Sequence, residues 1–311
     1  MNKIVNKLPI PIVGLMLALG ATGNLVLSYG DIYRNIFGCI SGIILLLVLI
    51  KIILYTKEVV NSLENPVVAS VFPTLSMGIM ILSTYLKPYN SSLAYFMWIF
   101  GLILHCILIC YFTIKHVVKF NIKKVFPSWF IVYVGIVVGS VTGPTFGMEG
   151  IGKILFWFGL ISYFVLLFIV SIRVFKVKEI PEAALPTLVI YSAPGSLCLA
   201  GYMNSFQDKN LALVYLLLCL SQLIYLFVLI KLPSLLKLKF YPSYSAFTFP
   251  LVITGISLKL TNGFLANIGK PISFLKYLIK FEEFIAVAIV LYVLIRYIGF
   301  LFGKTENKKA A

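Results

Sequence analysis

The chain has 311 residues, of which 61% are hydrophobic and only 12% are charged. A soluble domain needs roughly 25% charged residues to cover its surface, so this composition excludes a soluble globular protein. The net charge of +16 does not indicate nucleic-acid binding, because no basic face is paired with a soluble fold. The five cysteines fall inside apolar stretches, and their pattern predicts no disulfide framework.

Long apolar segments recur along the chain with short polar gaps between them. Each is near the ~20 residues that cross a hydrocarbon core of ~30 Å. We predict ten spans, at 8–28, 33–55, 66–86, 91–115, 127–144, 152–174, 185–204, 210–231, 242–259 and 282–302. The first segment follows two lysines and could instead be a signal peptide, but its pattern returns in later spans. Residues 1–311 are therefore expected to form a single transmembrane domain.

The basic residues predict the orientation of the spans. If the N-terminus is placed in the cytoplasm, most of the 26 Lys and Arg residues fall on that side of the membrane. Loops that stay in the cytoplasm carry an excess of Lys and Arg. We therefore expect a multi-pass protein of the plasma or inner cell membrane with both termini in the cytoplasm.

Odd-numbered and even-numbered spans differ in composition. The odd spans carry no charged residue between their ends and are rich in Gly, Pro, Ser and Thr. Prolines open them at intervals of about 60 residues, which is typical of a repeated unit. These prolines are Pro9, Pro66, Pro127, Pro186 and Pro242. The even spans are more uniformly aliphatic, so we predict five hairpins around a central pore, with the odd helices inside.

A second helix-breaking residue follows most of these prolines after seven or eight residues. The breakers are Pro73, Gly135, Pro194 and Pro250, and the first span has Gly14 and Gly20 instead. Proline in the middle of a helix removes one backbone hydrogen bond and kinks the helix. In lipid, the freed carbonyl is costly unless it faces protein or a water-filled cavity. The kinks could serve packing alone, but their repetition at matching offsets favours a cavity.

Phe249 is the strongest candidate for a functional side chain. It stands directly before Pro250 on a segment that also carries Ser245 and Thr248. A bulky apolar ring on a pore helix can act as a hydrophobic gate, although a phenylalanine in a membrane helix usually packs against lipid or core. We predict that Phe249 is a pore gate. The other residues predicted to line the pore or kink its helices are Gly14, Pro73, Ser76, Gly135, Pro194, Ser196, Thr248 and Pro250.

No pattern of residues indicates catalysis, and we predict neither enzyme activity nor a metal or other cofactor. Glu282 and Glu283 lack the surrounding motif of an intramembrane protease, and we expect them to mark the outer end of the last span. His105 points away from the helix face shared by Cys106 and Cys110, so these residues do not make a tetrahedral metal site. Core packing is the simpler interpretation of that group.

Five stretches together resemble the tellurite-resistance/dicarboxylate transporter family, which includes the slow anion channels of guard cells. They are PIPIVGLMLALG, NPVVASVFP, FPSWFIVYVG, LPTLVIYSAPGSLCLAGY and PSYSAFTFPL, one in each odd span. The resemblance implies ten helices arranged as five hairpins around a pore. It also implies a homotrimer with one pore in each protomer, and a gating phenylalanine that corresponds to Phe249.

An anion that crosses an uncharged path needs partial positive charge, which backbone N–H groups, hydroxyls and helix N-termini supply. A buried Lys or Arg would hold the anion too tightly for rapid conduction. The sequence therefore favours a channel for passive permeation of small inorganic or organic anions. The alternative is a proton-coupled or exchange carrier for C4-dicarboxylate, sulfite or tellurite-type anions, although the inner spans lack a titratable group for such coupling. Mid-span kinks argue against a scaffold without transport activity.

Overall fold

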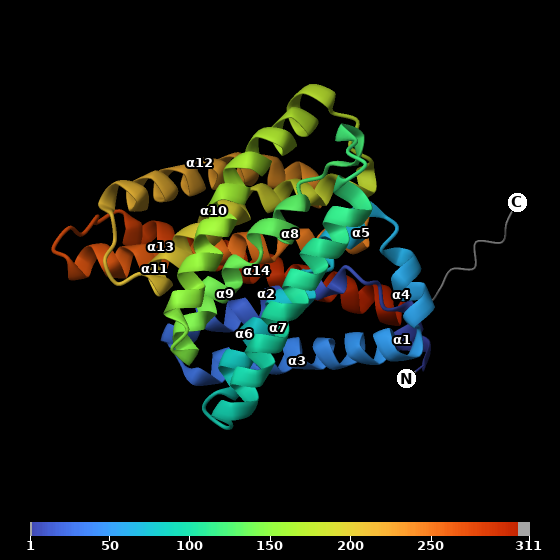
Figure 1. The fold of residues 1–311 in the computed structure, drawn as a ribbon, viewed down its shortest axis with the longest axis horizontal. Coiled ribbons are helices and arrows are strands. Elements are labelled where there is room, and N and C mark those ends of the chain that lie inside the picture. The colour runs from blue at the N-terminus through green and yellow to red at the C-terminus, as the bar shows by residue number, and fades with distance from the viewer. Residues whose placement is uncertain (1, 304–311) are drawn as a thin grey trace, which may run out of the picture.

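A computed structural model describes residues 2–303, and every regular element in that range is a helix (Figure 1). Five long helices correspond to the even spans: α3 (Asp31–Leu54), α7 (Ser91–Phe112), α10 (Glu149–Ser171), α12 (Leu211–Leu236) and α14 (Leu275–Phe302). The odd spans are α2 (Ile12–Leu25), α5 and α6 (Pro66–Val71 and Thr74–Leu86), α8 and α9 (Trp129–Val134 and Val137–Thr142), η6 and α11 (Glu182–Ser192 and Ala193–Ser205), and η7 and α13 (Pro242–Phe247 and Phe249–Asn267). The elements labelled η6 and η7 are 3₁₀-helices, whose turns are tighter than those of an α-helix.

Within residues 2–303, nine helical segments are long and apolar enough to cross a membrane, which confirms an all-α membrane protein. The remaining predicted span, the first one at 8–28, contains only the 14-residue helix α2, because Pro9 and Pro11 precede it in a turn. The Lys7 ammonium of α1 (Asn2–Lys7) donates to the carbonyl oxygens of Leu301 and Gly303, at 3.4 and 3.2 Å. The two ends of the described chain thus lie on the same side, as an even number of crossings requires.

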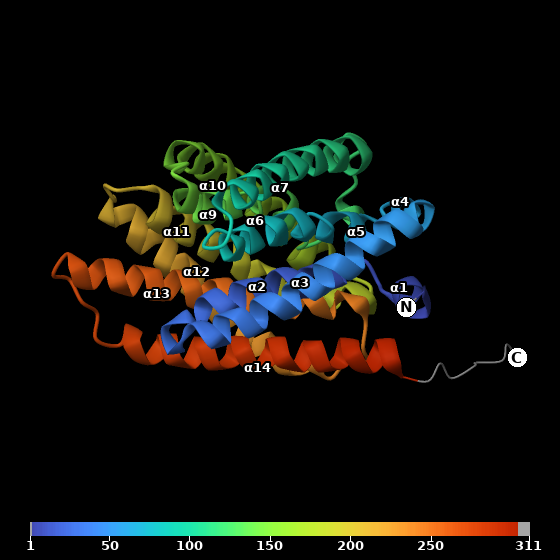
Figure 2. The same ribbon diagram turned by 90° about the horizontal axis from the view of Figure 1, so that it is seen from below.

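The helices form an inner ring and an outer layer. Each inner helix packs against the long helix that follows it, which gives the hairpins α2–α3, α6–α7, α9–α10, α11–α12 and α13–α14. The inner helices also contact one another in the order α2, α6, α9, α11, α13, and α13 returns to α2. These contacts close a ring of five helices, and Figure 2 shows α14 and α3 beside α2 and α13 on one side of it.

Burial separates the two layers in the way that the compositions predict. Between 61 and 83% of the residues in the inner spans that follow α2 are buried, against 28–39% in the outer helices. Helix α2 is buried at every residue except Asn24. The exposed side chains of the outer helices are mostly Leu, Ile, Phe and Val, which suit contact with lipid chains.

Four inner segments are interrupted near their middle, beside the predicted helix breakers. Helix α5 ends before Phe72 and Pro73, and α8 ends before Gly135 and Ile136. In the other two segments, a 3₁₀-helix changes to an α-helix, at Ala193 in one and at Thr248 in the other. Each segment therefore consists of two half-helices that meet inside the ring.

Two boundaries differ from the prediction, and both differences move charged residues into helices. Helix α13 continues to Asn267, so Lys259 lies inside it, and α14 begins at Leu275 and not near Glu282. The Lys259 ammonium lies 3.2 Å from a carboxylate oxygen of Glu283, so these two charges are paired. The ion pair offsets the cost of holding charged groups at this depth.

Gly135 offers a test of the break in the third inner segment. A methyl group at this position would overlap the Ile131 carbonyl oxygen and would lie 3.1 Å from a ring carbon of His105. We expect Gly135→Ala to destabilise the protein by about 1–3 kcal/mol, because the backbone oxygen cannot move aside as a flexible side chain could. Thermal unfolding of the purified protein measures the effect.

The matched control is Gly42→Ala, on the lipid-facing side of the helix bundle in α3. No described atom outside its own helix lies within 4 Å of a methyl group built there. Alanine is favoured over glycine in a helix by about 0.5–1 kcal/mol, so this variant should unfold no earlier than the wild type. Equal losses of stability in the two variants would contradict the close approach at Gly135.

Candidate functional site

A cavity of about 30 Å³ lies where the five inner segments meet. Each segment contributes to its lining, for example through Gly14, Thr74, Gly135, Ala193 and Phe249. Most of the lining atoms are carbon atoms of aliphatic and aromatic side chains. A cavity of this size has no room for an anion with its hydration shell. In this arrangement the centre of the ring is closed to a hydrated anion.

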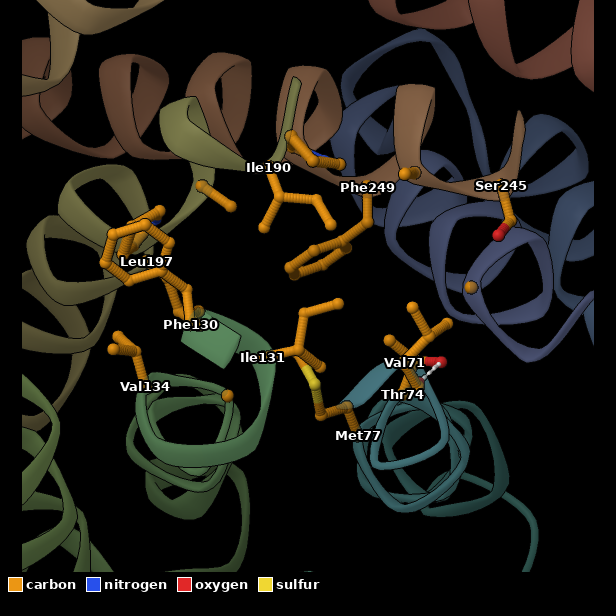
Figure 3. A pocket seen from close by; sticks show the side chains of 16 residues that line it. Val71, Thr74, Met77, Phe130, Ile131, Val134, Ile190, Leu197, Ser245 and Phe249 are labelled. Atoms are coloured by element: carbon orange, nitrogen blue, oxygen red, sulfur yellow. Dashed lines mark hydrogen bonds between the residues drawn. The ribbon is translucent and has the colours of Figure 1, made fainter. Parts of the chain in front are cut away.

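The ring of Phe249 fills the centre of this space. Figure 3 shows it pointing from α13 into the cavity, with Ile190 and Ile131 on either side. The side chain is only 6% exposed. The change from the 3₁₀-helix η7 to the α-helix α13 at Thr248 brings the ring to this position, because Phe249 is the first residue of the new helix.

Five of the nine predicted site residues line the cavity together: Gly14, Gly135, Pro194, Phe249 and Pro250. Gly14 faces Ser245, and a methyl group on Gly14 would lie 3.1 Å from the Ser245 hydroxyl oxygen. The glycines therefore allow the inner helices to approach each other closely around the aromatic ring.

The other four predicted residues, Pro73, Ser76, Ser196 and Thr248, are buried in contacts between and within helices and do not line the cavity. The Ser76 hydroxyl donates to the Pro73 carbonyl oxygen at 2.7 Å. The Ser196 hydroxyl is 2.9 Å from the Ser192 carbonyl oxygen and 3.1 Å from the Thr254 hydroxyl. Since these helices are buried on all sides, the composition alone could not show which face is turned toward the centre.

The electrostatics of the cavity depend on helix ends. None of the described residues that line it is charged. Helices α6, α11 and α13 begin at Thr74, Ala193 and Phe249, and all three of these first residues are part of the lining. The N-terminus of a helix carries partial positive charge, so the three ends favour an anion between them.

His105 is a buried link between inner helices, and the sequence had indicated only that it was part of the core. It belongs to the outer helix α7 but is 0% exposed. Its Nε2 donates to the Val132 carbonyl oxygen at 3.1 Å, and its Nδ1 lies 2.8 Å from the Ser76 hydroxyl. The imidazole thus joins the broken segments α5–α6 and α8–α9. Cys106 and Cys110 are exposed on other faces of α7.

A second polar group lies at the end of the ring opposite the termini. There the Lys259 ammonium donates to the Leu25 carbonyl oxygen and the Ser28 hydroxyl, both at 2.8 Å, and to Glu283 at 3.2 Å. The Tyr29 hydroxyl donates to Glu283 at 3.0 Å, and this carboxylate raises the pKa of Tyr29. Glu282 is 0% and Glu283 only 5% exposed, so the two glutamates at this end of the ring are buried between helices.

This polar group borders a wide opening. A cavity of about 440 Å³ between α2, α11 and α13 is lined by Lys209, Lys259, Asn24 and Asn267, among others. Lys209 lies in the loop after α11, and desolvation by the surrounding residues lowers the pKa of its ammonium group. The opening lies on the side of the ring away from the chain ends.

Residues 7–298 match the family model of SLAC1, described as voltage-dependent anion channel. The chain belongs to the SLAC1 family. No individual curated protein matches the chain. The match extends from the end of α1 into the last turns of α14, so it includes all five hairpins, and the family confirms the resemblance found in the sequence. SLAC1 proteins are membrane channels and transporters for anions, not a family of enzymes.

Cysteine labelling tests which face of α11 is turned toward the cavity. Ala193 lines it, whereas the native Cys198 on the same helix is 0% exposed and does not. The experiment uses a background in which the exposed cysteines are replaced by serine and Phe249→Ala admits water; these cysteines are Cys39, Cys106, Cys110 and Cys219. In this background, Ala193→Cys should react with a small membrane-impermeant thiol reagent. Cys198 should stay unlabelled, and equal labelling of both positions would contradict the assigned face.

Proposed function

We propose that this SLAC1 family member is an anion channel that passes small anions passively through its inner ring and is gated by Phe249. The position of the Phe249 ring supports this proposal most directly, because it fills a narrow cavity to which all five inner segments contribute (Figure 3). The ring lies beside three helix N-termini, where an anion would be favoured. An obstruction at that place would control every ion on this path.

We further propose that the protein crosses the plasma or inner cell membrane ten times, with both termini in the cytoplasm. The contact between Lys7 and the end of α14 supports an even number of crossings. The excess of basic residues on the side of the termini supports their orientation. The resemblance to slow anion channels suggests a homotrimer in which each protomer has its own pore, surrounded by lipid.

The uncharged lining suits rapid conduction. An anion must be attracted strongly enough to enter and weakly enough to leave, and a lysine or arginine at the centre would favour binding over release. Helix N-termini carry only about half an elementary charge each, which gives a shallower binding site. The positive charges on the side of the termini would raise the local concentration of anions. We therefore propose small inorganic or organic anions as the permeating species.

Phe249 closes the path by excluding water. An anion loses most of its hydration shell in a narrow apolar constriction, and there the lining offers few polar atoms in exchange. The ring is attached directly at the start of α13, before Pro250, where no preceding α-helical turn fixes it. A small rotation of the half-helix at Thr248 would move the ring away from the centre. Opening of the gate thus requires a local movement of this half-helix.

A carrier is the second candidate, because the structure contains a buried carboxylic acid within a membrane helix, Glu282. Coupling of anion movement to protons uses such groups. Glu282 does not line the central cavity, however, and this favours the channel. Recordings in planar bilayers separate the two functions: a channel gives unitary currents that reverse at the anion equilibrium potential. A carrier for C4-dicarboxylate, sulfite or tellurite-type anions gives a saturating flux without unitary steps.

The gate is tested by shortening Phe249. Phe249→Ala removes the ring and should admit water, so the single-channel conductance should rise severalfold above the wild type. Phe249→Leu should give an intermediate conductance, because its side chain fills part of the same space. Currents are compared per folded protein, which is measured by gel filtration of each variant.

Phe247→Ala is the matched control for this experiment. Phe247 is also fully buried, but its ring packs 4.8 Å from that of Tyr244 and does not line the cavity. Its removal should reduce stability and leave the conductance of each open channel nearly unchanged. If Phe249→Ala behaves like Phe247→Ala, then Phe249 is an ordinary core residue and not a gate.

The uncharged lining also predicts selectivity. Without a fixed cation, discrimination among small anions should follow the cost of removing their water. Permeability should therefore rank iodide and nitrate above chloride, with modest differences between them. Reversal potentials of the Phe249→Ala channel under bi-ionic conditions measure this ranking. A strong preference for chloride, or permeation by cations, would contradict the uncharged path.

A further inference from the structure

Glu282 is a buried acid that the proposed conduction path does not use. It lies in α14 and is 0% exposed, and neither of its carboxylate oxygens has a hydrogen-bond partner among residues 2–303. The Gln222 amide nitrogen and the Tyr225 hydroxyl of α12 are also buried without a hydrogen-bond partner in the described chain. An ionised carboxylate without partners is very costly to bury, whereas the protonated acid is a neutral group that can donate a hydrogen bond. In this packing Glu282 therefore carries a proton.

The position of Glu282 connects it to the pore helix α13. A methyl group built on Gly255 of α13 would lie 3.9 Å from the Cβ atom of Glu282 and 3.3 Å from Leu25 of α2. Gly255 is six residues after Phe249 on the same helix, a distance of about 9 Å along its axis. Glu282 thus packs directly behind the helix that positions the Phe249 ring.

Few other charged or titratable groups face this acid. On α13 there is Lys259, one helical turn beyond Gly255, and on α14 there is Glu283, which holds the Lys259 ammonium. Tyr29 donates to Glu283, and Tyr225 approaches from α12. Helix α2 contains no titratable side chain. The nearest cation is therefore already paired with the neighbouring glutamate.

A groove reaches the site from the outer layer. It lies between α12 and α14, has a volume of about 470 Å³, and is lined by Gln222 and Tyr225 together with apolar side chains. Lys259, at the other side of the site, lines the wide opening opposite the chain ends. The groove belongs to the lipid-facing layer, so the wide opening beside Lys259 is the side from which water can approach this polar group.

We propose that Glu282, with Gln222 and Tyr225, is a proton-binding site that holds α14 against the pore helix α13 and so favours the closed path. Loss of the proton leaves a carboxylate that must gain water or compete with Glu283 for Lys259. Either change disturbs the packing of α14 against Gly255. The closed arrangement is the one that binds the proton, so removal of the proton favours movement of α13 and opening.

The proton site is tested first without any measurement of transport. The wild-type melting temperature in detergent should fall as pH rises above about 5, because the folded protein keeps a proton on Glu282 that the unfolded chain releases. The fall should reach about 2–4 °C per pH unit until the pH at which Glu282 of the folded protein also loses its proton, and should level off above it. Glu282→Gln keeps the shape of the neutral acid and cannot ionise, so this part of the fall should disappear. Parallel curves for the wild type and Glu282→Gln would overturn the proposal.

Glu283→Gln is the matched control, because it removes a carboxylate one residue away and breaks the ion pair with Lys259. This variant should melt earlier at every pH and still show the fall that depends on Glu282. If Glu283→Gln and not Glu282→Gln abolishes the pH dependence, the site has been assigned to the wrong residue and the proposal fails.

The link to the pore rests on the proposed channel function and is measured separately. Currents at fixed voltage should rise with the pH on the side away from the termini, by up to about tenfold per pH unit for one linked proton. In Glu282→Gln they should stay low and independent of pH. A current that falls with rising pH, or an unchanged dependence in Glu282→Gln, would overturn the link. Absence of any current together with a melting curve altered by Glu282→Gln would refute the channel and leave the proton site standing.

Discussion

The interruption of the inner helices is the feature on which the rest of the structure depends. A backbone carbonyl without a partner cannot be exposed to lipid chains, so a broken helix must be surrounded by protein. Four of the five inner segments have such a break, and the breaks come together inside one ring. Only a complete outer layer can shield them, which explains why each broken segment is followed by a long, unbroken, aliphatic helix.

The same constraint explains the polar residues of the ring. Hydroxyl groups close to the breaks donate to nearby carbonyl oxygens: Ser76 to Pro73, Thr248 to Ser245, and Thr254 to Pro250. These hydroxyls add local bonds to carbonyl oxygens beside the breaks, a kind of bonding that bends helices. Such pairing uses the hydroxyls locally and leaves the central cavity with an apolar lining. The centre of a ring built in this way is narrow, apolar and, among the described residues, uncharged.

Much of this arrangement could be predicted from the sequence, because layers and breaks have strong compositional signals. The period of the prolines indicated five repeated hairpins, and the predicted breakers Pro73, Gly135, Pro194 and Pro250 lie at the observed interruptions or within two residues of them. The direction of single side chains could not be predicted in the same way. A helix that is buried on every face has no amphipathic pattern, so Ser76 and Ser196 could not be distinguished from residues that line the cavity.

The buried polar residues were missed for a related reason. A charged residue near a predicted helix end is usually exposed, and Glu282 was interpreted in this way because α14 was expected to begin there. The helix begins at Leu275, which places the acid two turns inside. The helix is held here by tertiary contacts of the neighbouring residue. Lys259 of α13 and Tyr29 bind Glu283, and these partners are far away in the sequence. No local pattern contains that information.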